Sequence, residues 1–369
     1  MTTTTKPRRS GSPPRPTPRS QLPLLASEPH GGEAGARLPV LDQRQRGATF
    51  LEVPVKAILN SPATTGMGFW SLNPYVGCEF GCTYCYARET HKWVAERHQV
   101  GGAAGAEPDM PAWEAFERRI LVKTTAAAVL QRTLFPAKLE GCSLVIGTAT
   151  DPYQPAERRF RLTRSLLEAL LGWRGLSLGI ITKSPLVLRD LDLLKRLSER
   201  HELTVNISLA SVDAALLRRI EARSPAPHAR LRALKGLTSA GIHAGLLVAP
   251  ILPGITDSRE ALAAIMAAGK AAGARYVAGF PLRLGPAART RFLPHLAEQF
   301  PELVERYHHR FGHSQSAGKD YTEALKRRIR SLQQAYGFPV DSGMSRRERE
   351  GRAPRRQVIP EVVEQWKLL

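Results

Sequence analysis

Short apolar runs alternate with amphipathic segments along most of this chain. The runs are nearly continuous, as in strands buried on both faces, and the segments between them carry apolar residues at helical spacing. This alternation predicts a parallel sheet covered by helices. The expected strands, in chain order, are residues 69–75, 144–146, 178–181, 203–209, 245–248 and 276–280.

Helices are expected between and after these strands. A small-residue insertion at 101–111 and a short extended stretch at 120–122 interrupt the pattern before it becomes regular. Six strand-and-helix units are fewer than the eight that close a full barrel, so the predicted fold is α/β, a partial (β/α)6 TIM-like barrel. The expected helices are residues 86–98, 124–134, 157–173, 186–200, 212–222, 228–240, 258–272 and 288–299.

The two ends of the chain differ from this central part. Residues 1–45 are rich in Pro, Ser, Thr, Gly and Arg with little periodicity, which predicts a disordered basic tail. The barrel is expected to span 46–300. Residues 301–369 are expected to form a helical and basic C-terminal extension, helical over 302–336 and ending in a charged, solvated run at 344–357.

Composition limits the class of protein. Hydrophobic residues make up 43% of the 369 positions, enough for a sizeable core. The longest apolar runs, such as 244–252, are far too short to span a bilayer. The N-terminus is polar, basic and proline-rich, and it lacks the apolar segment of a signal peptide. We therefore expect a cytoplasmic protein with no membrane partner.

The net charge of +20 favours a polyanionic partner, with nucleic acid the first candidate. Much of the excess lies at 6–19 and 346–356, within the two ends. Solvated basic tails with no partner are therefore the alternative explanation of this charge.

The cysteines are the strongest chemical signal in the sequence. Three of the four fall within eight positions, Cys78, Cys82 and Cys85, whereas disulfide scaffolds spread their cysteines along the chain. Three thiolates on one short loop can bind three irons of a [4Fe–4S] cubane and leave the fourth iron open. Gly77 and Gly81 tolerate the dihedral angles that wrapping round a cluster requires.

A structural zinc site is the alternative reading of the same cysteines. Structural zinc prefers four ligands arranged as two pairs. The fourth ligand would then have to be Cys142, His91 or His98. The spacing favours the iron–sulfur cluster over this alternative.

The motif NPYVGCEFGCTYCYAR, followed by VIGTATDPYQPAERR, IITKS and VNISLAS, resembles the radical S-adenosylmethionine (SAM) superfamily. Within it, the chain is similar to the spore photoproduct lyase-like branch, also called DNA-repair photolyase-like, over roughly residues 46–300. The resemblance implies a [4Fe–4S] cluster whose open iron binds S-adenosyl-L-methionine. One electron then cleaves SAM to methionine and a 5′-deoxyadenosyl radical, which takes a hydrogen atom from the substrate.

The same resemblance implies SAM contacts at the ends of three strands. Thr150 and Asp151 follow the second core strand, Lys183 follows the third, and Ser208 ends the fourth. Asp151 is expected to accept from the SAM ammonium, with Thr150 bonding nearby. Lys183 and Ser208 are expected at the SAM carboxylate or a ribose oxygen. The alternative is that each is an ordinary cap or turn residue.

Two tyrosines flank the third cysteine. In the family, the residue before that cysteine lies by the adenine, which implies such a place for Tyr84. Tyr84 or Tyr86 is also expected to pass a hydrogen atom or an electron, and core packing is the alternative for one of them. The segment 249–256 resembles the backbone cradle of the family for adenine, although its prolines also suit a stiff loop.

One residue departs from the branch. The spore lyase has a hydrogen-donor cysteine shortly before a Thr-Ser-Asp sequence, and Thr148 stands in its place here. A hydroxyl is a poor hydrogen-atom donor compared with a thiol. Cys142 lies six positions earlier, and its expected role is that of a small buried residue. The departure argues against thymine-dimer repair and leaves the SAM chemistry intact.

The leading hypothesis is thus a radical SAM enzyme, acting on DNA or RNA as the first substrate candidate and on a protein or peptide as the second. It would need an electron donor such as flavodoxin or ferredoxin. The alternative is a non-catalytic nucleic-acid-binding protein with a structural metal site. His308, His309 and His313 are expected on a polar surface helix.

Overall fold

The computed structural model describes residues 39–43, 47–91, 110–135 and 139–340. All of them belong to one compact unit of the chain. The expected N-terminal tail up to residue 38, the insertion at 101–111 except for its last two residues, and the charged run at 344–357 lie outside these ranges.

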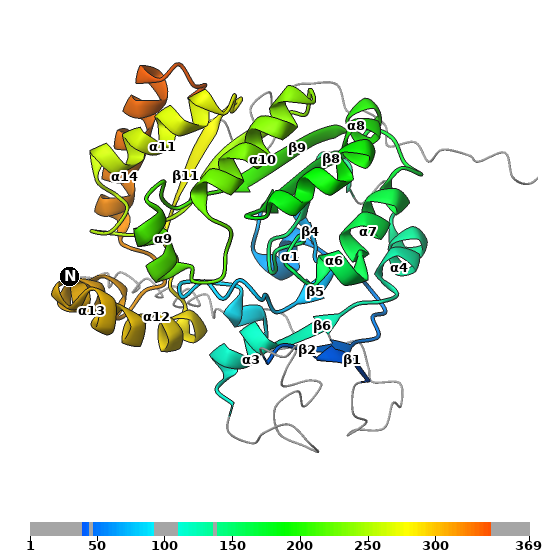
Figure 1. Cartoon of the computed structure of the whole chain (residues 1–369), viewed down its shortest axis with the longest axis horizontal. Helices are drawn as coiled ribbons and strands as arrows, with labels where there is room; N and C mark the ends of the chain where they lie inside the picture. Colours follow the sequence, from blue (N-terminus) through cyan, green and yellow to red (C-terminus); the bar gives the residue numbers. More distant parts are fainter. Residues whose placement is uncertain (1–38, 44–46, 92–109, 136–138, 341–369) are drawn as a thin grey trace, which may run out of the picture. The chain divides into compact units, whose positions relative to one another are not determined.

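A curved sheet of seven strands forms the centre of this unit (Figure 1). Six of its strands are parallel, and β3 pairs antiparallel with β4 at one edge. Six parallel strands confirm the predicted partial (β/α)6 barrel. In sheet order the strands are β11 (Val277–Pro281), β10 (Ala244–Ile251), β9 (Glu202–Ser208), β8 (Ser177–Thr182), β7 (Ser143–Ile146), β4 (Trp70–Leu72) and β3 (Leu59–Asn60).

Helices pack along the outer face of this sheet, and most of them match the expected ranges. The segment 157–173 is not one helix, because Arg161 adopts a left-handed conformation with φ of 52°. The break turns the Glu157 carboxylate onto the backbone amides of Thr163 (2.9 Å) and Arg164 (3.2 Å), which begin the next helix. The helices are α4 (Ala126–Thr133), α6 (Glu157–Phe160), α7 (Leu162–Leu170), η1 (Pro185–Asp190), α8 (Leu191–Arg200), α9 (Ala214–Ile220), α10 (Pro227–Ser239) and α11 (Arg259–Ala271).

A second sheet of four short strands was not predicted. Its order is β1-β2-β6-β5, and β1 lies within the range 1–45 that was expected to be a disordered tail. Two to four residues per strand are too few for a clear period in the sequence. Strand β5 leads directly into the cysteine loop, so this sheet fixes one end of that loop. Its strands are β1 (Val40–Gln43), β2 (Thr49–Glu52), β5 (Tyr75–Val76) and β6 (Arg119–Val122), with α1 (Pro62–Thr65) and α3 (Ala112–Arg118) nearby in the sequence.

The C-terminal extension is helical, as predicted. It contains η2 (Pro301–Leu303), α13 (Val304–Phe311) and α14 (Lys319–Ala335), and α14 packs on α11 and β11. The helix before it, α12 (Pro286–Gln299), matches the one expected at 288–299. The three histidines near residue 310 are exposed, as expected for a surface helix and its end. Among the described residues, no helix has the length and apolar character needed to cross a bilayer.

Alternate residues of the main sheet face the helices or the barrel interior. On the interior side, Leu247 of β10, Ala278 of β11 and Tyr276, which precedes β11, form a buried cluster. The Tyr276 hydroxyl donates to the Asn206 side chain, and its ring covers Gly245. This packing lies on the same face of the sheet as Ser208, which pairs in register with Leu247.

The packing of the Tyr276 ring over Gly245 depends on the absence of a side chain at residue 245, because a Cβ there would lie 2.3 Å from that ring. We expect Gly245→Ala to lower the free energy of unfolding by about 1–3 kcal/mol through overpacking. Thermal unfolding measures the change. The matched control is Gly68→Ala, where a Cβ meets nothing within 4 Å. Equal melting temperatures for the two variants would contradict the prediction, because they would show that the Tyr276 ring accommodates the extra methyl group without loss of stability.

Candidate functional site

The cysteine loop, residues 77–85, follows β5 at the carboxyl ends of the parallel strands. Cys78 and Cys82 are buried, Cys85 is half-buried, and none forms a disulfide. Burial raises the pKa of the Cys78 thiol, and the nearby charges of Asp151, Cys82 and Cys85 act in the same direction. Burial likewise raises the pKa of Cys82. Three interacting thiols, two of them buried, fit a cationic group that would stabilise them as thiolates.

Within the described ranges, no three His, Cys, Asp or Glu side chains gather round one metal ion. The candidate fourth ligands of the zinc alternative lie elsewhere. His91 Nε2 lies 3.5 Å from the Arg119 carbonyl, and its ring packs edge-on against Phe116. Cys142 precedes β7, at the opposite end of that strand from the cysteine loop. His98 is outside the described residues. In a [4Fe–4S] cluster each cysteine binds its own iron, and three cysteines of one loop match that demand.

Both glycines of the loop are required by its surroundings. Gly77 has φ of 87°, and a Cβ there would lie 2.8 Å from the Phe116 carbonyl oxygen, which accepts from the Cys78 amide at 2.9 Å. Gly81 has φ of 59°, and a Cβ there would collide with Arg223. Both positions favour glycine for conformation and for space, as the sequence predicted for the conformation.

The loop after β7 holds one side of the cysteine loop. Thr150 Oγ1 donates to the Gly77 carbonyl at 2.6 Å, and Gln154 Nε2 donates to the same carbonyl at 3.2 Å. In return, the Glu79 amide donates to Gln154 Oε1 at 3.0 Å, and the Ala156 amide donates to Glu79 Oε2 at 2.6 Å. The hydroxyl hydrogen of Thr150 is therefore used inside the protein.

Two arginines that share one buried carboxylate hold the other side, and we call Arg88, Arg223 and Glu117 the arginine clamp. Arg88 Nη2 donates to the Cys82 carbonyl at 2.9 Å and pairs with Glu117 at 2.6 Å. Arg223 Nε donates to the Glu79 carbonyl at 2.7 Å, and its guanidinium also pairs with Glu117. The clamp thus satisfies two loop carbonyls from outside the barrel.

Asp151 is fixed where the ends of β7 and β8 meet. Its carboxylate accepts from Thr182 Oγ1 at 2.7 Å, from the Lys183 amide at 2.7 Å and from the Tyr153 amide at 2.9 Å. Burial raises the pKa of Asp151, whereas these hydrogen bonds lower it. The charge of Asp151 is also one cause of the raised pKa of the Cys78 thiol, so these two predicted site residues lie within electrostatic range of each other.

Lys183, Ser208 and Tyr84 meet at the ends of the next strands. Lys183 Nζ donates to Ser208 Oγ at 3.1 Å, and Ser208 Oγ donates to the Ala249 carbonyl at 3.1 Å. The same ammonium lies 6.0 Å from the centre of the Tyr84 ring. Ala249 begins the segment that resembles an adenine cradle. Lys183, Ser208 and Tyr84 therefore lie close to the start of that segment.

Sequence reasoning missed the buried ion pair beneath them. Glu221 and Arg230 are both fully buried and pair with each other. Glu221 accepts from the Tyr84 hydroxyl, and Arg230 Nη1 donates to the Ser208 carbonyl at 3.0 Å. The pair thereby fixes two predicted site residues at once. Nothing local marks either residue, because charged residues such as Glu221 at the end of α9 and Arg230 within α10 are usually exposed.

Tyr86 lies next to the residue that replaces the donor cysteine of the branch. Its hydroxyl donates to the Thr148 carbonyl, and the side chain is 43% exposed. Thr148 Oγ1 accepts from Asn73 Nδ2 at 3.2 Å, and Asn73 Oδ1 accepts from the Ala149 amide at 2.9 Å. Asn73 opens the cysteine motif, yet its role was not predicted.

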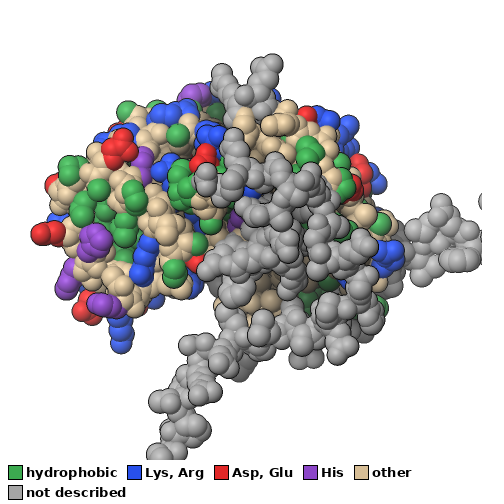
Figure 2. All heavy atoms as spheres, turned by 90° about the horizontal axis from the view of Figure 1, so that it is seen from below, with side chains coloured by type: hydrophobic (Ala, Val, Ile, Leu, Met, Phe, Trp, Pro, Cys, Tyr) green, Lys and Arg blue, Asp and Glu red, His purple; other side chains and the backbone are tan. Residues whose placement is uncertain are grey.

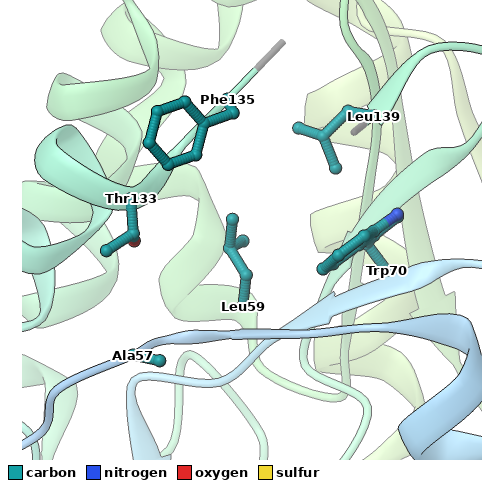
Figure 3. Close-up of a pocket in the computed structure, with 6 residues that line it drawn as sticks. All are labelled: Ala57, Leu59, Trp70, Thr133, Phe135 and Leu139. Atoms are coloured by element: carbon teal, nitrogen blue, oxygen red, sulfur yellow. The ribbon is translucent and has the colours of Figure 1, made fainter. Parts of the chain in front are cut away.

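A separate pocket of about 230 Å³ lies beside the edge strand β3 and the start of β4 (Figure 3). Trp70 begins β4, whereas the cysteine loop follows the other end of the strand. The lining carries no titratable side chain, so the pocket is not part of the candidate site. The lining residues are Ala57, Leu59, Trp70, Thr133, Phe135 and Leu139.

Comparison with known proteins gives related sequences over most of the chain. An uncharacterized protein of Mycobacterium tuberculosis is 35% identical over 297 residues, which cover 80% of this chain and 83% of that protein. An uncharacterized protein of Methanocaldococcus jannaschii is 28% identical over 207 residues, covering 56% and 69% of the two chains.

Solved structures share the fold. A spore photoproduct lyase complexed with dinucleoside spore photoproduct has a TM-score of 0.54 at 17% identity, covering 78% of this chain and 79% of the lyase. A variant of the lyase with bound AdoMet and dinucleoside spore photoproduct has a TM-score of 0.51 at 18% identity, covering 72% and 74%. The profile of the radical SAM superfamily matches residues 72–265. This chain therefore belongs to the radical SAM superfamily and is an enzyme with radical-based chemistry.

Proposed function

We propose that Cys78, Cys82 and Cys85 bind three irons of a [4Fe–4S] cluster and that SAM binds the fourth. The observation that carries the proposal is a loop of three interacting thiols held at the strand ends by hydrogen bonds from both sides. When bound, the cluster supplies the electron that cleaves SAM to methionine and a 5′-deoxyadenosyl radical. The protein's own residues hold the reactants and exclude water.

The residues at the strand ends are proposed to orient SAM. The fixed carboxylate of Asp151 would receive the SAM ammonium, and Lys183 with Ser208 would bind the carboxylate or a ribose oxygen. These roles are supported by the convergence of the three side chains near the cysteine loop. Thr150 already donates its hydrogen to Gly77, so we assign it to holding the loop and not to a direct donor contact with SAM.

The two tyrosines are proposed to have different roles. Tyr84 is 4% exposed and donates to Glu221, which supports a fixed place beside the adenine. Tyr86 is much more exposed and lies against Thr148, which supports hydrogen-atom transfer. In that step the phenolic O–H bond breaks, a C–H bond forms at the acceptor carbon, and the unpaired electron moves to the tyrosine oxygen.

For the substrate we propose DNA or RNA. The net charge of +20 supports a polyanion, and the lyases of the same fold bind a dinucleoside spore photoproduct. On the face shown in Figure 2, Lys and Arg side chains lie among acidic, hydrophobic and histidine side chains and do not form one block. The overall charge, and not a basic block on this face, therefore supports the proposal. Thr148 supports a reaction other than dimer repair.

The cluster proposal predicts the behaviour of cysteine variants after anaerobic reconstitution with iron and sulfide. The full chain should bind about four irons and absorb at about 400 nm. Once its cluster is reduced, it should cleave SAM to 5′-deoxyadenosine. Cys78→Ala, Cys82→Ala or Cys85→Ala should each lose the cluster, whereas Cys142→Ala should keep it. Reconstituted protein that binds SAM yet forms no 5′-deoxyadenosine would contradict the proposed function.

The role proposed for Tyr86 predicts that deuterium from the solvent is incorporated into 5′-deoxyadenosine. In D2O the phenolic position exchanges, so 5′-deoxyadenosine formed without added substrate should gain deuterium from Tyr86, as measured by mass spectrometry. Tyr86→Phe should reduce this deuterium to background while the cluster absorption persists. Tyr336→Phe, at a tyrosine that follows α14 outside the candidate site, serves as the matched control and should keep the label. Undiminished labelling in Tyr86→Phe would remove Tyr86 from hydrogen transfer.

The substrate proposal predicts salt-dependent binding of single-stranded DNA or RNA. The logarithm of the binding constant should fall linearly with the logarithm of salt concentration, by about 0.7 per phosphate contacted. Fluorescence anisotropy with the full chain, and with residues 39–340 alone, separates the site from the ends. If a folded 39–340 chain retains no affinity, the ends account for binding and the active site does not take nucleic acid.

A further inference from the structure

One side of the cysteine loop meets solvent through an arginine. The side chain of Arg223 is 50% exposed, and its Nε donates to the Glu79 carbonyl at 2.7 Å. A Cβ on Gly81 would lie 1.9 Å from Arg223 Nη2, so the guanidinium also lies directly against the backbone there. Glu79 and Gly81 both stand between Cys78 and Cys82. An exposed side chain therefore touches the backbone that joins two of the cysteines.

This region carries an excess of positive charge. Arg88, Arg223 and Arg291 all approach the single carboxylate of Glu117, the last of them at 3.6 Å. Arg291 is 27% exposed, and its guanidinium lies over the Trp113 ring. Three guanidinium groups share one carboxylate, so a net positive charge remains beside the loop.

Arg218 extends this charge across the surface. It is exposed on α9, and its guanidinium donates to the Ala222 carbonyl, adjacent to Arg223. We call Arg218, Arg223 and Arg291 the arginine patch. The patch draws on α9, the turn after it and α12, which are joined because Arg219 Nε donates to Gln299 Oε1 at 3.2 Å.

The arginine patch lies apart from the proposed SAM contacts. Asp151, Lys183 and Ser208 approach the cysteine loop from the ends of parallel strands. The patch shares Arg223 with the arginine clamp, whose carboxylate, Glu117, lies on α3, and α3 packs against α12. Figure 1 shows α3, α9 and α12 beside the sheet and not within its row of strands. A partner on the patch would therefore leave the SAM contacts free.

We propose that the arginine patch is the docking surface for an acidic one-electron donor protein, whose electron reaches the cluster across the backbone of residues 79–81. This inference rests on the proposed function, since it requires the cluster. In the transfer the donor loses one electron and the oxidised cluster gains it, and no bond is made or broken. Charge complementarity selects an acidic protein and speeds its encounter.

The test uses the full chain with its reconstituted cluster and flavodoxin hydroquinone as the probe. Stopped-flow absorbance follows loss of the cluster band as the cluster is reduced. Sodium dithionite, used at high salt where its own negative charge is screened, serves as a small donor that needs no docking surface. Arg218→Glu should slow reduction by flavodoxin about fivefold at low salt, because it reverses a steering charge. The difference should shrink as salt screens the surface.

The matched control is Arg327→Glu, which makes the same charge change at an exposed position on α14. It should leave both reductants unaffected, and dithionite should reduce all three proteins at one rate. Binding of oxidised flavodoxin, measured by calorimetry, should weaken for Arg218→Glu alone. This second measurement does not depend on turnover.

Three results would overturn the docking proposal: equal flavodoxin rates in all three proteins, equal slowing in the two variants, or slowing of dithionite by Arg218→Glu. Arg218→Gln removes the charge without reversing it and replaces Arg218→Glu if that variant fails to fold, with a smaller slowing expected and the same overturning results. A full chain that takes up no iron would instead contradict the proposed function, before any question of docking.

Discussion

The rest of the site depends on how the backbone of the cysteine loop is held. Residues 77–85 form no helix, and beyond β5 they pair with no strand, so their polar groups need partners from elsewhere. Gln154 and Thr150 supply those partners from the sheet side. Arg88, which follows the loop, and Arg223, in the turn after α9, supply them from the other side, and Glu117 of α3 pairs with both arginines. Hydrogen bonds thus hold the loop to the strand ends on one side and to the helical segments on the other. These bonds to the backbone fix the positions of the three thiols.

Two buried carboxylates make this arrangement specific. Glu117 pairs with Arg88, and Glu221 pairs with Arg230, with every partner almost wholly buried. Such pairs add little net stability, because desolvation offsets their attraction, yet removing one partner costs about 3–5 kcal/mol. Each pair also bonds the backbone or a side chain of the site, namely the Cys82 carbonyl, Tyr84 and the Ser208 carbonyl. A loop in another position would leave these charges unsatisfied.

Periodicity predicted the main sheet well, because strands buried on both faces are nearly uniform in apolar residues. The strand expected at 245–248 is observed as Ala244–Ile251. Periodicity failed where tertiary contacts decide, as at Arg161 and in the second sheet with its short strands. The turn at Arg161 allows the Glu157 carboxylate to accept from backbone amides in the first turn of the next helix. The cysteines and strand-end residues could be predicted because motif and topology place them. Gln154, Glu221 and Arg230 could not, since their burial depends on packing between distant segments.

The replacement of a donor thiol by Thr148 has a consequence that the geometry sharpens. Its hydroxyl oxygen accepts from Asn73, which holds the side chain in the network at the end of β4 and not as a free reactant. A hydroxyl O–H is also a poor hydrogen-atom donor compared with a thiol. The Tyr86 hydroxyl donates to the carbonyl of the same residue, and Tyr86 remains partly open to solvent. If Tyr86 has the proposed role, its hydrogen exchanges with solvent and is not stored on a thiol, so the final step would differ from that of the branch while the early steps match it.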